Sequence, residues 1–155
     1  MDTKLTMAML PKTTNNPYFV SCRRGADEAA QSLGFEILWD GPTGADPRKQ
    51  AAFVESWVAA HVPAIAVSVE DASAVSPALR RARQSGVKIL TWDSDAAKEA
   101  RDFFVNQATP EGIGDVLSSE AARVLSGRGE IGILTATMTA PNQSEWLRHI
   151  KAKLL

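Results

Sequence analysis

The 155-residue sequence has few of the residues that build metal sites, disulfides and nucleophilic active sites. It contains one cysteine, Cys22, and two histidines, His61 and His149. A single cysteine excludes an internal disulfide and any metal site that needs several cysteines. Cys22 falls within one expected helix and His61 lies at the end of another, so they do not suggest a nucleophile and its base. The sequence therefore predicts no metal site, no catalytic residue and no enzymatic activity.

Glycine-rich motifs that hold phosphate groups are also absent. The sequence contains neither G-x-G-x-x-G nor G-x-x-x-x-G-K-[ST], and it lacks the G-x-S-x-G turn of α/β-hydrolases. Residues 127–132 (GRGEIG) contain glycines, but they precede an expected strand rather than a helix, and we interpret them as a turn. We therefore expect no nucleotide and no other cofactor.

Charge and hydropathy exclude two further classes of protein. The 17 lysine and arginine residues nearly balance the 18 acidic ones, which leaves no excess positive charge to attract nucleic acid. No apolar run approaches the roughly 18 residues that a membrane span requires. The opening residues MDTKLTMAML lack the apolar stretch of a secretory signal, so either the protein is cytosolic or its leader is absent from this chain.

The sequence does contain a regular alternation of short apolar runs with longer segments of helical periodicity. The expected strands are 5–10, 35–39, 64–69, 87–92, 102–106 and 130–135. The expected helices are 18–33, 47–61, a third helix that is capped by Ser73 or Ser76 and ends at 83, 110–125 and 142–155, with a helical turn at 95–100. This order is typical of βαβ units, and it predicts an α/β fold with a doubly wound parallel sheet and helices on both faces.

The alternation also indicates how the chain divides into lobes. We expect residues 1–102 to form an N-terminal lobe, and residues 103–155 to form a crossover and the incomplete first part of a second, similar lobe. Two lobes of ordinary size would need about 250–300 residues. The chain is therefore expected to be truncated, and self-association is one way in which it could cover exposed apolar surface.

The loops after the expected strands indicate a class of ligand. In a parallel sheet, ligands bind beyond the carboxyl ends of the strands. These loops carry Lys, Asn, Gln, Asp, Ser and Thr, with Tyr18 and Phe19 in the first loop, and no His or Cys. Amides and carboxylates exchange hydrogen bonds with hydroxyl groups, and aromatic rings cover apolar C–H surface. The sequence therefore predicts a neutral polyol ligand.

Five segments, in the right order, resemble the periplasmic sugar-binding proteins of ABC importers (type I, ribose-binding-like). They are LPKTTNNPYF (10–19), WDGPTGADPRKQ (39–50), ILTWDSD (89–95), FVNQATPEGIG (104–114) and TATMTAPNQSEW (135–146). Within that family the combination is most similar to the rhamnose-binding and autoinducer-binding branch. The resemblance implies a type I periplasmic-binding-protein fold, a periplasmic location, a sugar bound between two lobes, and an ABC permease in the membrane as the partner of the full-length parent.

The resemblance also implies which residues bind the ligand. They are Lys12, Asn16, Tyr18, Phe19, Asp93, Ser94, Asn142 and Gln143, with Asn106 and Gln107 as hinge residues. Lys12 matches a lysine that donates to ligand hydroxyls, and Asp93 matches an aspartate that accepts from them. Asn142 stands where the autoinducer-binding branch has an acidic residue. We therefore favour a monosaccharide, a pentose or a deoxyhexose such as rhamnose, over the furanosyl quorum signal.

Structural alternatives stay open for each of these residues. Lys12 could be a solvated charge at the end of a strand, and Asp93 and Asn142 could serve as helix caps. Tyr18 or Phe19 could belong to the core, where we also expect the side chains of Trp39, Trp57, Trp92 and Trp146.

Other functions stay open as well. Binding of the furanosyl quorum signal is one, and the ligand-sensing domain of a LacI-type repressor is another, although such a repressor begins with a basic helix-turn-helix and no such segment precedes the first expected strand. Part of the second lobe is missing, so we expect the 155-residue chain alone to bind sugar weakly or not at all.

Overall fold

The structure, a computed structural model, describes residues 5–154. Along the chain lie β1 (Thr6–Leu10), α1 (Pro17–Leu33), β2 (Glu36–Trp39), α2 (Pro47–Ala59), β3 (Ala64–Val67), α3 (Ala72–Gln84), β4 (Lys88–Trp92), the 3₁₀ helix η1 (Lys98–Ala100), β5 (Phe103–Val105), α4 (Pro110–Val124) and α5 (Pro141–Leu154). The first five expected strands are confirmed, with ends that differ from expectation by at most two residues, and the five long helices are confirmed as well. Helix α3 begins before either expected cap, and the expected end of the last helix at residue 155 lies outside the described residues.

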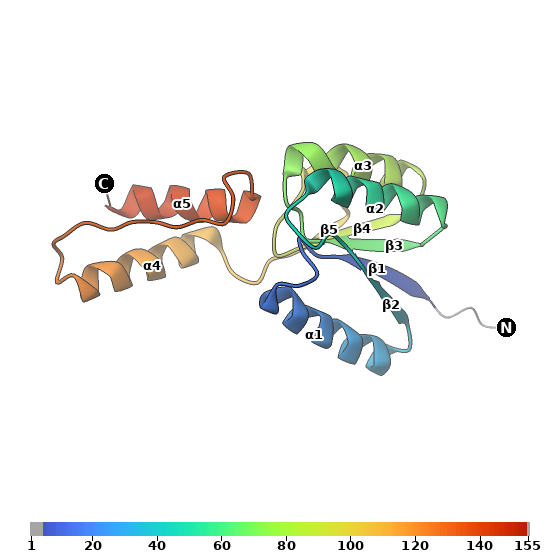
Figure 1. Cartoon of the computed structure of the whole chain (residues 1–155), viewed down its shortest axis with the longest axis horizontal. Helices are drawn as coiled ribbons and strands as arrows, with labels where there is room; N and C mark the ends of the chain where they lie inside the picture. The colour runs from blue at the N-terminus through green and yellow to red at the C-terminus, as the bar shows by residue number, and fades with distance from the viewer. Residues whose placement is uncertain (1–4, 155) are drawn as a thin grey trace.

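The five strands form one parallel sheet in the order β2-β1-β3-β4-β5. Helices α2 and α3 cover one face of this sheet and α1 covers the other (Figure 1). The predicted fold class, an α/β fold with a doubly wound parallel sheet, is confirmed. The strand β5 pairs with β4, so the sheet extends to Val105, and the division of the lobes at 102/103 stays a prediction.

The main core lies between the sheet and the pair α2 and α3. Apolar side chains that are fully removed from solvent come from both layers; among them are Leu10, Val54, Ile65, Val67, Val75, Leu79 and Ile89. Burial of each such side chain stabilises the fold by about 1.5–3 kcal/mol relative to leaving it exposed. This core holds the carboxyl ends of β1, β3 and β4 at fixed positions along one edge of the sheet.

Polar residues in the loops start the helices. The side chain of Asn16 accepts from the amide of Tyr18 and caps α1, and Thr109 caps α4 as expected. The expected cap of α3 at Ser73 or Ser76 is wrong. Asp71 caps this helix, since its carboxylate accepts from the amides of Ser73 and Ala74. The hydroxyl of Ser76 instead accepts from the amide of Ala97, 3.0 Å away.

The expected sixth strand at 130–135 is also wrong, because this segment forms no strand. A strand exists only where a neighbour supplies hydrogen-bond partners, and within residues 5–154 no segment pairs with it. The segment instead runs beside α4 and α5, which pack against each other (Figure 1). The two helices approach closely at Gly114, where a Cβ atom would lie only 2.5 Å from the Cβ of His149.

Two possible features are absent from this part of the chain. No helix within residues 5–154 combines the length and the hydropathy that crossing a membrane would require. Over the same residues, no three His, Cys, Asp or Glu side chains come together in a way that could hold a metal ion.

Candidate functional site

A cavity of about 340 Å³ opens where the carboxyl ends of the strands face the start of α5. This volume lies near the lower end of the range of roughly 300–1,000 Å³ for small-molecule sites. Of the predicted ligand-binding residues, Lys12, Asn16, Tyr18, Phe19, Asp93, Asn142 and Gln143 line the cavity, and the predicted hinge residue Gln107 lines it too. The structure thus brings together residues that lie up to 131 positions apart in the chain, from Lys12 to Gln143.

The parallel sheet explains why Lys12 and Asp93 meet. Lys12 lies two residues after β1 and Asp93 follows β4 directly; both strands end at the same edge, on either side of β3. Gln107 lies two residues after β5, and Asn142 lies in the first turn of α5. The ends of β1, β4 and β5 and the start of α5 therefore each place one polar side chain at the same part of the cavity wall.

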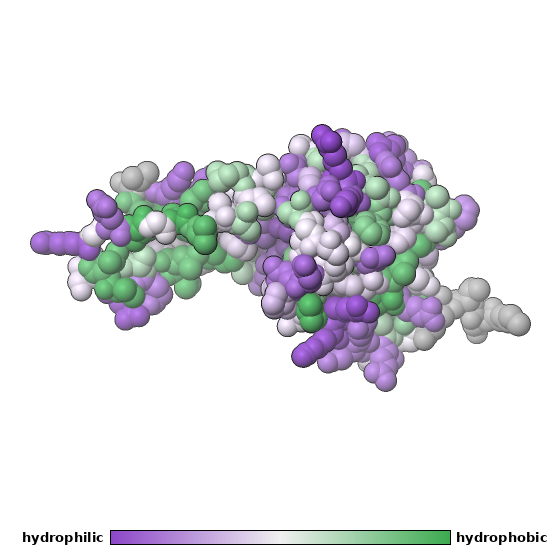
Figure 2. Space-filling view, viewed as in Figure 1, coloured by the Kyte–Doolittle hydropathy of each residue, from purple (hydrophilic) through white to green (hydrophobic). Residues whose placement is uncertain are grey.

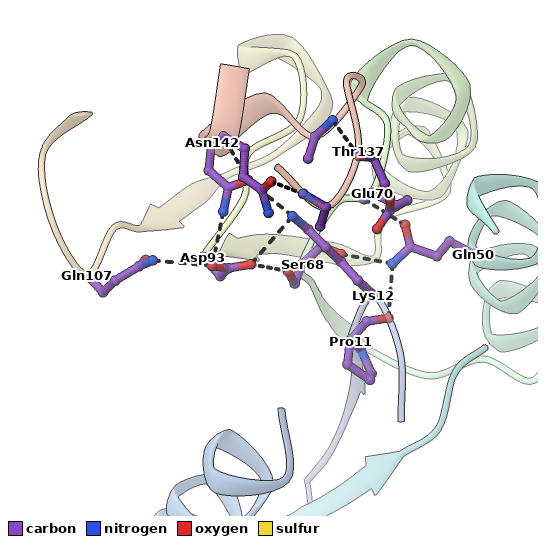
Figure 3. A network of polar contacts seen from close by, with 12 residues as sticks. Pro11, Lys12, Gln50, Ser68, Glu70, Asp93, Gln107, Thr137 and Asn142 are labelled. Carbon is purple, nitrogen blue, oxygen red and sulfur yellow. Dashed lines mark hydrogen bonds and ion pairs between the residues drawn. The ribbon is translucent and has the colours of Figure 1, made fainter. Parts of the chain in front are cut away.

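The carboxylate of Asp93 is the centre of this cluster (Figure 3). Its Oδ1 accepts from the side-chain amides of Gln107 and Asn142, both 3.2 Å away. Its Oδ2 accepts from the hydroxyl of Ser68 at 2.7 Å and lies 3.8 Å from the ammonium nitrogen of Lys12. A buried carboxylate is tolerated when it is paired and hydrogen-bonded in this way. Asp93 is thus held in one orientation at the wall of the cavity.

Lys12 is buried rather than solvated, with 8% of its surface exposed, so the alternative of a solvated charge at the strand end is wrong. Its ammonium group donates to Oδ1 of Asn142 at 3.1 Å and pairs with Asp93. Burial lowers the pKa of Lys12 below the ordinary lysine value, against the opposing effect of the carboxylates of Asp93 and Glu70. The cavity therefore contains a cation that is only partly compensated for its loss of hydration.

Asn142 connects the sheet with the region that follows it. Its amide nitrogen donates to Asp93, and its oxygen accepts from Lys12 and from the backbone amide of Gln143. The helix α5 begins one residue earlier, at Pro141, so Asn142 is not the residue before the helix as a capping role would require. The side-chain oxygen of Gln143 accepts from the amide of Ala136 at 2.8 Å and from the hydroxyl of Thr135.

The backbone at Asp93 explains the position of Ser94. Asp93 adopts a left-handed conformation with φ of 62°, and the amide of Ser94 donates back to the carbonyl of Trp92 at 2.6 Å. The chain therefore reverses here, and Ser94 is not among the residues that line the cavity. Ser94 is fully buried, and its hydroxyl has no hydrogen-bond partner within the described residues. Its carbonyl accepts from the amide of Val69 at 3.0 Å, which ties this turn to the loop after β3.

The two predicted hinge residues differ from each other. Asn106 is exposed, does not line the cavity, and accepts from the amide of Ala108 at 3.4 Å. The side chain of Gln107 contacts Asp93 and faces the cavity, in addition to its place between the sheet and α4. A hinge role for either residue stays a prediction.

Aromatic side chains form the apolar part of the cavity wall. Phe19 is buried and packs edge-to-face on Trp92, with ring centres 5.5 Å apart, while Tyr18 is half-exposed and packs edge-to-face on Phe19. Partial burial, together with the nearby carboxylate of Asp93 and thiol of Cys22, raises the pKa of Tyr18 above its ordinary value. Trp146, which we expected in the core, also lines the cavity.

Several polar residues of the site were not predicted; three of them, Gln50, Ser68 and Glu70, form one network. Gln50 is fully buried, and its amide nitrogen donates to the carbonyls of Pro11 (3.0 Å) and Ser68 (2.8 Å) (Figure 3). Its oxygen accepts from the amide of Glu70 at 2.9 Å. One side chain from α2 thus fixes the loops after β1 and β3. Glu70 follows the expected strand 64–69, so the rule that indicated Lys12 and Asp93 could have found it. Ser68 lies within that expected strand, which in the structure ends at Val67, and Gln50 lies within a helical pattern; neither position gives such a signal.

Comparison with known proteins identifies the class of this fold and site. The periplasmic binding protein domain matches residues 7–154, and the chain belongs to this family. It is 31% identical over 96 residues to the ribose import binding protein of Escherichia coli strain K12, across 61% of this chain and 32% of that protein. It is 28% identical over 127 residues to the ribose import binding protein of Salmonella typhimurium, across 81% of this chain and 42% of that protein.

Solved structures give the same picture over nearly the whole chain. A solute-binding protein of an ABC transporter from Burkholderia graminis, in complex with D-arabinose, is 33% identical with a TM-score of 0.92, and covers 99% of this chain and 53% of its own. One from Clostridium phytofermentas with bound L-rhamnose is 28% identical, also with a TM-score of 0.92, and covers 99% of this chain and 50% of its own. LsrB from Clostridium saccharobutylicum in complex with AI-2 is 30% identical with a TM-score of 0.85, over 96% of this chain and 49% of its own.

These alignments confirm the type I periplasmic-binding-protein fold, and they also show how much of that fold the chain contains. It spans 32% and 42% of the length of these two ribose-binding relatives and about half of the length of the three solved structures.

Proposed function

We propose that the cavity binds a monosaccharide, a pentose or a deoxyhexose such as rhamnose, and that the chain is part of a periplasmic solute-binding protein that delivers this sugar to an ABC permease. The observation that carries the proposal is the composition of the cavity wall. Fixed polar groups from the ends of three strands and from α5 face the same space as Tyr18, Phe19 and Trp146. No catalytic chemistry is part of the proposal.

A sugar has both polar and apolar surface, so its binding site needs hydrogen-bonding groups as well as aromatic rings. Each hydroxyl group donates one hydrogen bond and accepts up to two, and the wall offers donors on Lys12, Gln107 and Asn142 and acceptors on Asp93 and Asn142. The ring also has apolar C–H surface, which aromatic rings cover well. The related structures with D-arabinose and L-rhamnose support this ligand class for the full-length protein.

Ligand binding in this proposal exchanges contacts within the protein for contacts with the sugar. Asn142 links Lys12 and Asp93 directly. A sugar hydroxyl that donates to Asp93 or accepts from Lys12 would take over part of this network, and closure of two lobes about residues 106–107 would bury it. The closed form would then be the one that the permease binds.

An NMR titration of the 155-residue chain tests the proposal. We expect millimolar D-arabinose or L-rhamnose to shift the backbone amide signals of residues around the cavity in a saturable way. Binding should be weak, since the chain spans only about half of the related structures. The same titration with AI-2 tests the competing furanosyl ligand. If AI-2 shifts these signals and neither sugar does, the proposal is wrong.

Two variants test whether the changes in the NMR signals arise from binding in the cavity. Asp93→Asn keeps a residue that tolerates the left-handed backbone but removes the charge, and we expect it to lose detectable sugar binding. Asp27→Asn removes an exposed carboxylate whose partner, Arg23, is exposed as well, and should leave binding unchanged. Equal binding by the two variants would contradict the assigned role of Asp93.

We also propose that the chain self-associates through apolar side chains of residues 106–154. Leu134 is 99% exposed, and Val116, Val124 and Met138 are also largely exposed. Sedimentation velocity should show a mass that rises with concentration for the wild-type chain and less so for Leu134→Asp. A wild-type chain that stays monomeric at every concentration would contradict this.

A further inference from the structure

The loop between β3 and α3 places a second carboxylate at the cavity, that of Glu70. Glu70 is 5% exposed and lines the cavity. Its backbone is held in place, because its amide donates to the buried side chain of Gln50 (Figure 3). Its φ angle does not lie in the left-handed region, so the loop presents the side chain without backbone strain.

Glu70 and Asp93 differ in what they bind. The two oxygens of Asp93 are occupied by Gln107, Asn142, Ser68 and Lys12. Within residues 5–154, the carboxylate of Glu70 accepts no hydrogen bond and forms no ion pair. The negative charge of Glu70 acts on Lys12 at a distance, but the ammonium group of Lys12 donates to Asn142 and pairs with Asp93. Glu70 therefore presents to the cavity a carboxylate to which no described protein group donates.

The carboxylate of Glu70 is accessible from the cavity. Its oxygens are not among the buried side-chain atoms that lack a hydrogen-bond partner, although no described protein group donates to them. An ionised carboxylate has two oxygens with about four acceptor positions and no donor of its own. Glu70 faces the cavity, so a molecule that occupies the cavity can donate to it.

We propose that Glu70 determines the specificity of the sugar site by accepting a hydrogen bond from a ligand hydroxyl, and that it selects neutral sugars against acidic ones. This inference rests on the function proposed above. The charged residues of the cavity wall are Lys12, Asp93 and Glu70, which leaves one negative charge in excess. A sugar acid or a sugar phosphate would bring a further negative charge next to two carboxylates, while a neutral sugar offers the hydroxyl donors that Glu70 lacks.

The test compares Glu70→Gln with Glu36→Gln. Glu36 is exposed at the amino end of β2, on the edge of the sheet opposite to the cavity, so its variant controls for the loss of one negative charge. D-Arabinose, L-rhamnose and D-glucuronate are titrated into the 155-residue chain and followed by NMR. We expect Glu70→Gln to weaken binding of the neutral sugar about tenfold or more, because a hydrogen bond to a charged group is worth more than one to an amide. Glu36→Gln should bind as the wild type does.

Two further readouts make the inference specific. Among deoxy analogues of the sugar that binds, one should have the same affinity for the wild type and for Glu70→Gln. This analogue lacks the hydroxyl group that donates to Glu70. The discrimination against D-glucuronate should also shrink in Glu70→Gln. Unchanged affinity of Glu70→Gln for the neutral sugar would overturn the role of Glu70 and leave the proposed function intact. If D-glucuronate binds the wild type and neither neutral sugar does, both proposals fail.

Discussion

The sheet region (residues 5–105) and the α4/α5 region (residues 106–154) were expected from the same kind of sequence pattern, but only the sheet region completes a core. In the sheet region, side chains such as Ile65, Leu79 and Ile89 are fully buried. In the α4/α5 region, the apolar side chains that are buried are Ala140 and Ile150, while Leu134 is almost fully exposed. Figure 2 shows hydrophobic atoms gathered on the surface over α4, α5 and the segment between them.

The difference teaches that an apolar pattern specifies a strand only where a neighbouring strand is present. β3 lies between β1 and β4 and is hydrogen-bonded on both sides. Residues 130–135 carry a comparable apolar run, but without a neighbouring strand among the described residues they form none. The following predictions test this contrast, in order of decreasing expected effect.

Hydrogen exchange should separate the two regions most clearly. Amides of β3 and β4 are in a buried parallel ladder and should exchange only when the whole sheet region unfolds, whereas amides of residues 130–135 should exchange almost freely. Because global stabilities of about 5–15 kcal/mol are usual, we expect protection to differ by a factor of roughly a thousand or more. Similar protection in both places, measured by NMR, would mean that residues 130–135 have a hydrogen-bonded neighbour after all.

Removing a leucine should matter in one region and not in the other. Leu79 is fully buried in the main core, so Leu79→Ala should lower the free energy of unfolding by about 2–5 kcal/mol. Leu134 is 99% exposed, so at a concentration where the chain is monomeric the same truncation there should change it by less than about 0.5 kcal/mol. Urea denaturation followed by circular dichroism measures both. A large loss for Leu134→Ala would show that this side chain is covered in solution.

A methyl group at Gly114 should disturb the α4/α5 region alone. The added carbon would lie 2.5 Å from the Cβ of His149, so α4 and α5 must move apart, at a cost of about 1–3 kcal/mol. Exchange of the α5 amides should become faster while that of β3 stays the same. Gly25→Ala is the matched control, because a Cβ there meets nothing within 4 Å. Equal effects of the two substitutions would contradict the close approach of α4 and α5.

The smallest expected effect is a pH dependence from Lys12. Its pKa is lowered in the folded chain, so between that lowered value and the ordinary 10.5 the unfolded chain binds more protons. The contribution of Lys12 to stability therefore rises with pH in this window, by at most about 1.4 kcal/mol per pH unit. The slope of unfolding free energy against pH, measured below pH 10.5, should be smaller in Lys12→Met than in the wild type. Identical slopes would show that Lys12 is not desolvated.

Much of the fold was predictable because it depends on local patterns. The apolar runs of β1 to β5 and the polar residues before α1 and α4 marked the elements, and the edge of the sheet at which Lys12 and Asp93 meet followed from the parallel order. The sixth strand failed because a strand depends on a partner distant in sequence, which a local pattern cannot reveal.

The parts of the site that were not predictable depend on individual contacts. The burial of Gln50 follows from its position on the inner face of α2, four residues before Val54. Ser94 turns away from the cavity because of the backbone conformation of the preceding residue, and residue type alone did not indicate that conformation. The unused acceptor on Glu70 is visible only once all possible donors have been placed in space.

The left-handed backbone at Asp93 has a consequence for how this site can diverge over evolutionary time. Few residues other than Gly, Asn and Asp adopt that conformation at low cost, so most single mutations at this position would strain the turn as well as change the ligand contact. Glu70 carries no such restriction. Under the proposed function, a change of sugar preference should therefore arise by mutation at Glu70 while Asp93 stays unchanged.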